Sequence, residues 1–365
     1  MTAGIQKRRR EWFGGIVYSE NPGFAMHVDH AMADSLGIPP AEGLVEGLYS
    51  APLDAHIAVT TRCNRKCREC YALNRDEPGV DLPPEQGRAI IDRLAAMDVF
   101  TVAFGGGEPF LYPHLFELAS HARLRNIVPN ITTNGSLIER DTADRCRIFG
   151  SVHVSCHRAR DLEALSVPVR LLSAVGVTPG LNMLVTSESF DDLPEVFRWA
   201  GRQGIGRVLL LRFKLTANNP ESSPLLLSAG QLRQLPAIVR RLSRRHGILP
   251  LFDCSLFPTL TGYRWAARKR LEYFDVEGCR GGNKFLAVTV SGDFKPCSFW
   301  PTTFGRAADL DRTTWAANPR LNEFRRQREH AACDACSQVN LCNGGCRLMP
   351  VEHCGCPLPR AADRS

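Results

Sequence analysis

Three cysteines stand close together in the sequence, at Cys63, Cys67 and Cys70, with the spacing C-x3-C-x2-C. The strand-like residues 56–60 come just before them, so we expect the cysteines on the loop that leaves the end of a strand. An iron–sulfur cluster is ordinarily held by four thiolates. Three would leave one iron open, and an open metal position is typical of catalytic rather than structural sites. The spacing therefore favours a catalytic iron–sulfur cluster, with a zinc site or a pair of buried thiols as the alternatives.

A glycine-rich segment follows one βα unit later. Directly after the strand-like residues 100–104 it comprises Gly105, Gly106, Gly107, Glu108 and Pro109. Glycines let the backbone approach a ligand closely, and backbone carbonyls together with Glu108 suit a cationic ammonium group. The cysteine triplet and this segment together resemble the radical SAM superfamily. The resemblance implies a [4Fe-4S] cluster whose open iron binds the amino and carboxylate groups of S-adenosylmethionine, with the glycine-rich segment binding the amino group.

Two positions depart from the pattern of that family. The residue before the third cysteine is usually aromatic in the family and is Glu69 here, which leaves Tyr71 as an alternative neighbour of the adenine. The turn after the fourth strand is often acidic or contains glycine in the family, whereas this chain has Cys156 and His157 there.

The chain alternates between strand-like and helical patterns from residue 55 onward. The strand-like runs lie near 55–60, 100–104, 128–132, 151–155, 180–185 and 207–212. The helical patterns lie near 84–97, 113–125, 139–148, 159–175, 190–203 and 228–246. Such units imply an α/β fold with a parallel sheet and helical crossovers. Because six units fall short of the eight of a closed barrel, we predict a partial (β/α)6 barrel whose rhythm stops after residue 246.

Further cofactor contacts are expected at the carboxyl ends of the strands, where barrels of this kind bind ligands. Ser155 follows the fourth strand, Asn182 lies in the fifth and Arg212 ends the sixth. The resemblance implies that Ser155 binds the ribose and Arg212 the methionine carboxylate, and Asn182 is expected to face the cofactor.

The C-terminal part of the chain is rich in cysteine. Nine of the fourteen cysteines lie there, at Cys254, Cys279, Cys297, Cys333, Cys336, Cys342, Cys346, Cys354 and Cys356. Their spacings resemble the SPASM domain, an extension of radical SAM enzymes that carries auxiliary iron–sulfur clusters; a zinc ribbon is the alternative. The resemblance implies two auxiliary clusters of the [4Fe-4S] type. The outer cluster would be held by Cys333, Cys336, Cys342 and Cys356.

The inner auxiliary cluster would be held by Cys279, Cys297 and Cys346, and its fourth ligand is open at this point. No cysteine follows Cys279 until Cys297. The cluster therefore either keeps an open iron, able to bind a substrate atom, or recruits Cys254 from a distant stretch. Of the two, the open iron is our prediction.

Three domains are expected. Residues 1–50 form an N-terminal extension, in which the strand-like runs 12–18 and 24–28 flank a turn and precede a short helix. This hairpin and helix resemble part of a peptide-recognition module, with a barrel-capping extension as the alternative. Residues 51–250 form the partial barrel, and residues 251–365 form the cysteine-rich iron–sulfur domain.

The composition is that of an ordinary globular protein, with 365 residues of which 44% are hydrophobic and 23% charged. No signal peptide or apolar membrane span is recognisable, so we predict a cytoplasmic protein with reduced cysteines and no membrane partner. The net charge is +7, and we interpret the basic clusters near 7–10, 240–245 and 325–328 as a basic tail and solvated helix faces. An aromatic content of 8% without basic interleaving argues against nucleic acid as a partner.

These patterns predict an enzyme that reductively cleaves S-adenosylmethionine to a 5′-deoxyadenosyl radical. The radical would modify a ribosomally synthesised peptide or a protein side chain by hydrogen abstraction, giving a crosslink, a decarboxylation or an oxidation. Oxidation to formylglycine is disfavoured because sulfatase-maturing relatives have an aspartate where this chain has Ser298. The electron donor would be a flavodoxin or ferredoxin. One alternative is a SPASM-type dehydrogenase of a small molecule. The other is a non-catalytic protein, either an iron–sulfur electron carrier or a zinc-stabilised binding protein. A non-catalytic protein would not need the segment Gly105–Pro109.

Overall fold

The computed structural model describes residues 6–21, 23–72, 79–261, 277–326, 333, 339–349, 353 and 355–356. Two of the C-terminal cysteines lie outside the described residues: Cys336, a predicted ligand of the outer cluster, and Cys354. Within the described residues, no helix is both long and apolar enough to cross a membrane.

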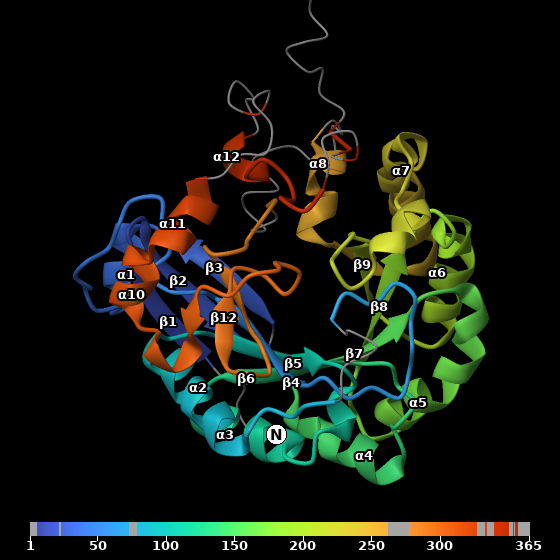
Figure 1. Cartoon of the computed structure of the whole chain (residues 1–365), viewed down its shortest axis with the longest axis horizontal. Helices are drawn as coiled ribbons and strands as arrows, with labels where there is room; N and C mark the ends of the chain where they lie inside the picture. Colours follow the sequence, from blue (N-terminus) through green and yellow to red (C-terminus); the bar gives the residue numbers. More distant parts are fainter. Residues whose placement is uncertain are drawn as a thin grey trace, which may run out of the picture.

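A curved sheet of seven parallel strands forms the main body of the molecule (Figure 1). The strands are β4 (Asp54–Thr60), β5 (Thr101–Gly106), β6 (Val128–Thr133), β7 (Ser151–Cys156), β8 (Pro179–Val185), β9 (Arg207–Arg212) and β10 (Leu249–Phe252). Six of them coincide with the predicted runs, which confirms the partial barrel. The seventh, β10, pairs in parallel with β9 after residue 246, so the prediction that the strand pattern stops there was wrong. Its four residues include Pro250, which weakens the strand signal.

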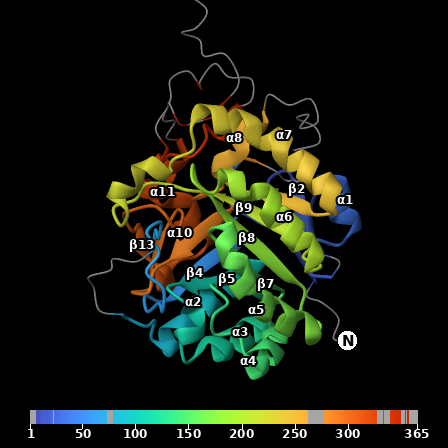
Figure 2. The ribbon, with the colours of Figure 1, turned by 90° about the vertical axis from the view of Figure 1, so that its right-hand side faces the viewer.

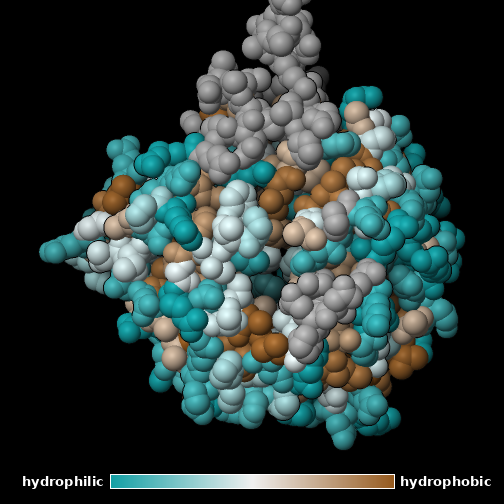
Figure 3. Space-filling model, viewed as in Figure 1, coloured by the Kyte–Doolittle hydropathy of each residue, from teal (hydrophilic) through white to brown (hydrophobic). Residues whose placement is uncertain are grey.

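Helices cover the outer face of this sheet, as Figures 1 and 2 show from two directions. They are α2 (Pro84–Ala96), α3 (Leu115–Leu124), α4 (Arg140–Arg145), α5 (Leu162–Ala174), α6 (Leu193–Arg202) and α7 (Ala229–His246). Side chains alternate along each strand. On β4, Ala55, Ile57 and Val59 are buried in the core that Ile90 and Leu94 of α2 share. The other side chains of the strands line the concave face, which opens as a hollow near the centre of Figure 3.

The C-terminal part extends the same sheet on the side of β4. β11 (Phe285–Val288) pairs in parallel with β4, then β12 (Asp293–Lys295) and β13 (Gly305–Arg306) add antiparallel strands. The full order is β10-β9-β8-β7-β6-β5-β4-β11-β12-β13, so the sheet stays open between β10 and β13. The remaining described helices here are α8 (Phe257–Leu260), α10 (Arg312–Ala317), α11 (Pro319–Arg326) and α12 (Val339–Cys342).

A separate antiparallel sheet precedes the barrel, in the order β1 (Gln6–Glu11), β2 (Gly14–Ser19) and β3 (Phe24–Val28), followed by α1 (His30–Ser35). The predicted hairpin and helix are present, but β1 was not predicted, and its basic residues were interpreted as a solvated tail. That interpretation was wrong for two of them. Lys7 donates to Val99 O at 2.8 Å, and Arg9 is ion-paired with Glu11 at 2.7 Å and only 2% exposed. Arg9 also donates to Ala51 O at 2.8 Å and to Pro52 O at 2.9 Å, so the two buried cations attach the small sheet to the start of the barrel.

Candidate functional site

The three-cysteine loop begins just after β4, at the carboxyl end of the sheet. Cys63, Cys67 and Cys70 are all half-buried, and the amide of Cys70 donates to Cys67 O at 3.3 Å. Burial raises the pKa of Cys67 to about 11, and negative charge on Glu69, Cys70 and Cys63 contributes to the increase. The three thiols are therefore electrostatic neighbours, as the ligands of one cluster must be.

The glycine-rich segment lies against the residues that lead into this loop. Gly107 N donates to Thr60 O at 2.7 Å, and Glu108 N donates to Arg62 O at 2.9 Å. A Cβ atom on Gly107 would stand 2.1 Å from Arg62 O, so no larger residue fits. At Gly106 the φ of +107° and a would-be Cβ contact of 2.3 Å with Thr60 O also require glycine. The two sequence motifs thus form one unit.

Glu108 connects this unit to the end of β6. Its carboxylate accepts hydrogen bonds from Thr133 Oγ1 at 2.7 Å, Asn134 N at 2.8 Å and Phe110 N at 3.3 Å. The side chain is buried, and burial raises the pKa of its carboxyl group while these three donors lower it. The carboxylate thus has three partners within the chain, an arrangement suited to supporting the backbone of the segment.

Ser155 and Asn182 are brought together on the concave face. They are partners in the pairing of β7 with β8. Asn182 accepts from His153 Nδ1 at 2.6 Å and donates to Thr132 Oγ1 at 3.3 Å. Arg212 does not join them, because the pairing places it beside Val185, whose side chain is in the core under the helices.

The guanidinium group of Arg212 instead holds the C-terminal part of the chain. It donates to Ser255 O at 3.1 Å and to His353 O. The structure therefore places two of the three predicted strand-end residues beside the concave face and the third behind it.

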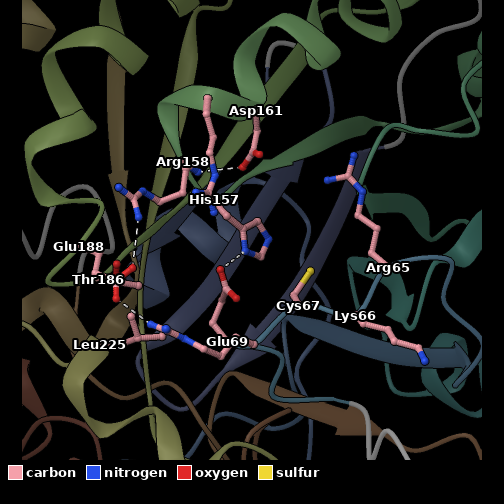
Figure 4. Close-up of a pocket in the computed structure, with 12 residues that line it drawn as sticks. Arg65, Lys66, Cys67, Glu69, His157, Arg158, Asp161, Thr186, Glu188 and Leu225 are labelled. Carbon is pink, nitrogen blue, oxygen red and sulfur yellow. Dashed lines mark hydrogen bonds and ion pairs between the residues drawn. The ribbon is translucent and has the colours of Figure 1, made fainter.

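A pocket of about 340 Å³ opens beside the cysteine loop, within the size range of small-molecule sites. Figure 4 shows Glu69 and His157 pointing toward one another at its centre, next to Cys67. His157 Nδ1 lies 2.9 Å from Glu69 Oε1, and this hydrogen bond lowers the pKa of Glu69 to about 2. Glu69 and His157 are two of the residues at which the sequence departs from the family pattern. They form one polar pair.

A second ion-pair group links the cysteine loop to the turns after β7 and β8. Glu188 accepts from Arg68 at 2.8 Å and from Arg158 at 3.2 Å, and Arg158 also pairs with Asp192 at 2.8 Å. The wall of the pocket is thus charged on both sides (Figure 4).

Comparison with known proteins agrees with this geometry. Residues 57–205, which contain the cysteine loop, the glycine-rich segment and the pocket-lining Glu69 and His157, match the profile of the radical SAM superfamily. Residues 57–205 are a radical SAM domain. The chain is similar to the PqqA peptide cyclase of Gluconobacter oxydans, with 26% identity over 332 residues that cover 84% of this chain and 89% of the relative.

The chain is also similar to a Fe-coproporphyrin III synthase and to a solved structure. The Fe-coproporphyrin III synthase of Methanosarcina barkeri is 28% identical over 235 residues, 57% of this chain and 59% of that protein. The crystal structure of Streptococcus suis SuiB bound to precursor peptide SuiA has a TM-score of 0.77 at 17% identity. That match covers 98% of this chain and 100% of SuiB. The SuiB likeness establishes the fold along nearly the whole chain.

The loop after β9 supports the cysteine loop of the radical SAM domain, and sequence reasoning did not find it. Asn218 Nδ2 donates to Tyr71 O at 2.8 Å, Asn219 Nδ2 donates to Cys70 O at 3.4 Å and Ser222 Oγ donates to Arg68 O at 3.3 Å. The only signal was a polar Asn-Asn-Pro turn at the carboxyl end of a strand, where site residues are expected.

The segment of Cys297 lies beside the cysteine loop, because the rings of Phe299 and Tyr71 have their centres 4.2 Å apart. Of the predicted inner set, Cys279 has electrostatic contact with both Cys297 and Cys346. For the outer set the structure describes Cys333, Cys342 and Cys356, and Cys336 is outside the described residues, so this set stays a prediction.

The arrangement of the thiol groups bears on which metal they could hold. Among the described residues, no three His, Cys, Asp or Glu side chains converge as the ligands of a single metal ion. Thiolates of an iron–sulfur cluster bind separate iron atoms and stand further apart than the ligands of one zinc ion. The half-buried, neighbouring thiols of Cys63, Cys67 and Cys70 are donors of the kind that an iron–sulfur cluster takes.

Proposed function

We propose that this radical SAM enzyme modifies a peptide or protein side chain by hydrogen abstraction. The main support is that the Gly105–Pro109 segment is hydrogen-bonded to the residues leading into the cysteine loop, beside the charged pocket. A [4Fe-4S] cluster, when bound, supplies the electron that splits S-adenosylmethionine into methionine and a 5′-deoxyadenosyl radical. A simple electron carrier would not need the Gly105–Pro109 segment, because it does not bind S-adenosylmethionine.

Cys63, Cys67 and Cys70 would hold this cluster, leaving one iron open for the cofactor. The backbone of Gly105–Pro109, supported by Glu108, would bind the amino group. Ser155 and Asn182 lie on the concave face, where Ser155 would contact the ribose.

Glu69 and His157 would line the nucleoside end of the site. The hydrogen bond between Glu69 and His157 holds both side chains in place at the pocket wall when no ligand is bound. We do not place Arg212 at the carboxylate, since its guanidinium group holds the C-terminal segment.

A peptide substrate is supported by the likeness to a PqqA peptide cyclase and by the outer edge of the N-terminal sheet. β3 is an edge strand, and within the described residues no further strand pairs with it. It exposes Phe24 at 43% and Met26 at 44%, and Met32 of α1 is 49% exposed. An extended peptide can add to such an edge as another strand, with its side chains against the apolar residues.

A small organic substrate is the second candidate, favoured by the similarity to a Fe-coproporphyrin III synthase. The two candidates differ in their need for the N-terminal sheet. A small substrate would enter the concave face without β3, whereas a peptide would depend on it.

Two auxiliary [4Fe-4S] clusters, held by the C-terminal cysteines, would accept the electron left on the substrate or pass it on. The physiological reductant would be a flavodoxin or ferredoxin. The cytoplasm is the compartment whose reducing conditions suit a chain with so many cysteines.

Binding to the edge of β3 tests the peptide proposal. Short peptides encoded beside the gene would be labelled and titrated against the protein by fluorescence anisotropy. Met26→Asp should weaken binding at least tenfold, because it places a charge in the apolar edge. Leu124→Asp, at a residue of α3 that is 80% exposed, is the matched control and should leave affinity unchanged. Equal affinity of both variants, or consumption of a porphyrin with no peptide bound, would favour the small-molecule candidate.

A further inference from the structure

We propose that Cys254 is the fourth thiolate of the inner auxiliary cluster, together with Cys279, Cys297 and Cys346, so that this cluster is closed and transfers electrons without binding substrate. The inference rests on the proposed function, which supplies the auxiliary clusters. It reverses the prediction from sequence, which favoured an open iron at this site.

The strand β10 is what brings Cys254 to the site. Asp253 directly follows β10, and its amide donates to Leu210 O of β9 at 2.9 Å. Cys254 then begins a short 3-10 helix that ends at Leu256. The chain continues into α8, whose Phe257 and Leu260 form an apolar cluster with Leu341 and Cys342. Cys254 is thereby placed next to the segment that carries Cys346.

The segment around Cys279 packs against residues 341–343, which precede Cys346. Gly278 N donates to Leu341 O at 2.9 Å, and Asn343 Nδ2 donates to Cys279 O at 3.1 Å. A Cβ atom on Gly278 would lie 1.7 Å from Cys342 O, so the two segments are packed backbone to backbone. Gly282 N donates to Pro296 O at 3.1 Å, which brings Cys297 beside the same turn.

The electrostatics of the thiols agree with these contacts. Burial raises the pKa of Cys254 well above its ordinary value, and charge on Asp253, Cys279 and Cys346 raises it further. Burial raises the pKa of Cys297 to about 11 and of Cys346 to about 12, and in each case Cys279 adds to the shift. Cys279 thus interacts electrostatically with each of the other three thiols, and Cys254 also interacts with Cys346, in agreement with the packing of their segments.

A buried cation accompanies the four thiols. Lys214 is 4% exposed, forms an ion pair with Asp253 and lies 4.2 Å from the centre of the Phe299 ring. It also interacts with Cys346 and Cys254. Four thiolates outweigh the positive charge of an oxidised cubane, so a closed cluster is anionic and gains from a nearby buried cation. Lys214, paired with Asp253, thus places a buried ammonium group beside the thiols.

Iron counting tests the assignment in a background that lacks the catalytic cluster. The Cys63→Ala, Cys67→Ala, Cys70→Ala protein should hold about eight iron atoms per chain after anaerobic reconstitution, four for each auxiliary cluster. Adding Cys254→Ala should remove between about one and four of them, depending on whether a three-iron cluster survives. Cys279→Ala is the positive control and should lose iron similarly. Cys146→Ala, at a thiol buried in the barrel core, is the matched control and should keep all of it.

A more conservative variant, Cys254→Ser, tests the assignment if Cys254→Ala folds poorly. Cys254→Ser preserves the shape of the side chain and should change the Mössbauer spectrum of one cluster. Added cyanide should alter the electron paramagnetic resonance signal of this variant but not that of its parent, whose inner cluster has no vacant iron.

Two results have distinct meanings. Unchanged iron and spectra on replacing Cys254, with iron lost on Cys279→Ala, would overturn the closed site and restore the open iron. Full retention of iron in Cys279→Ala as well would overturn the auxiliary-cluster assignment itself, and the closed site with it.

Discussion

Glu108→Ala is expected to weaken cofactor binding through the backbone that Glu108 supports. The carboxylate accepts two short hydrogen bonds, from Thr133 Oγ1 at 2.7 Å and Asn134 N at 2.8 Å. A hydrogen bond to a charged group contributes about 1.5–3 kcal/mol, so removal of both should cost about 3 kcal/mol or more in free energy of unfolding. The freed Gly105–Pro109 segment should bind S-adenosylmethionine at least about tenfold more weakly, which corresponds to ~1.4 kcal/mol.

Anaerobic titration of reconstituted protein with S-adenosylmethionine measures the affinity, and thermal denaturation measures the stability. Glu108→Gln is the matched control: it keeps the shape but offers one acceptor oxygen, so its affinity should fall between those of the parent and of Glu108→Ala. Iron content should be the same in all three proteins, because Glu108 is not a cluster ligand. Unchanged affinity and stability in Glu108→Ala would refute the supporting role.

Two further predictions concern polar pairs. His157→Asn and Glu69→Gln should each weaken S-adenosylmethionine binding by about tenfold (~1.4 kcal/mol). The double variant should bind no more weakly than either single variant, because the hydrogen-bonded pair acts as a unit. Fully additive losses in the same titration would show that the two residues act independently. Arg9→Ala should destabilise the protein by about 3–5 kcal/mol in denaturant unfolding, because Glu11 would be left as a buried carboxylate without its cationic partner. Arg8→Ala, on the exposed side of β1, should cost about 0.5 kcal/mol or less. Equal costs would show that the buried ion pair does not stabilise the protein.

The barrel was predictable because its strands and helices bury apolar side chains at regular intervals. β4 to β9 and α2 to α7 all follow such patterns, and the structure confirms them. β1 has no apolar residue, so hydrophobic periodicity could not reveal it. Its burial depends on Arg9 and Lys7 finding partners at Glu11 and at carbonyl groups far along the chain.

Part of the candidate site could likewise be predicted from the sequence, and part could not. Short-range spacing revealed the cysteine loop and the glycine-rich segment, because their residues are close in sequence as well as in space. The pairing of Glu69 with His157 and the approach of Cys254 to Cys279 depend on how distant strands are placed side by side. Arg212 shows the converse: it stands at a predicted strand end, but the pairing of β8 with β9 puts it on the opposite face from Asn182.

Formation of 5′-deoxyadenosine tests the central claim most directly. The reconstituted protein, supplied with dithionite and S-adenosylmethionine under anaerobic conditions, should release 5′-deoxyadenosine, measured by liquid chromatography and mass spectrometry. The Cys63→Ala, Cys67→Ala, Cys70→Ala protein should release none while retaining its auxiliary iron. Release by this variant at the rate of the parent would contradict the assignment of the catalytic cluster to these three cysteines.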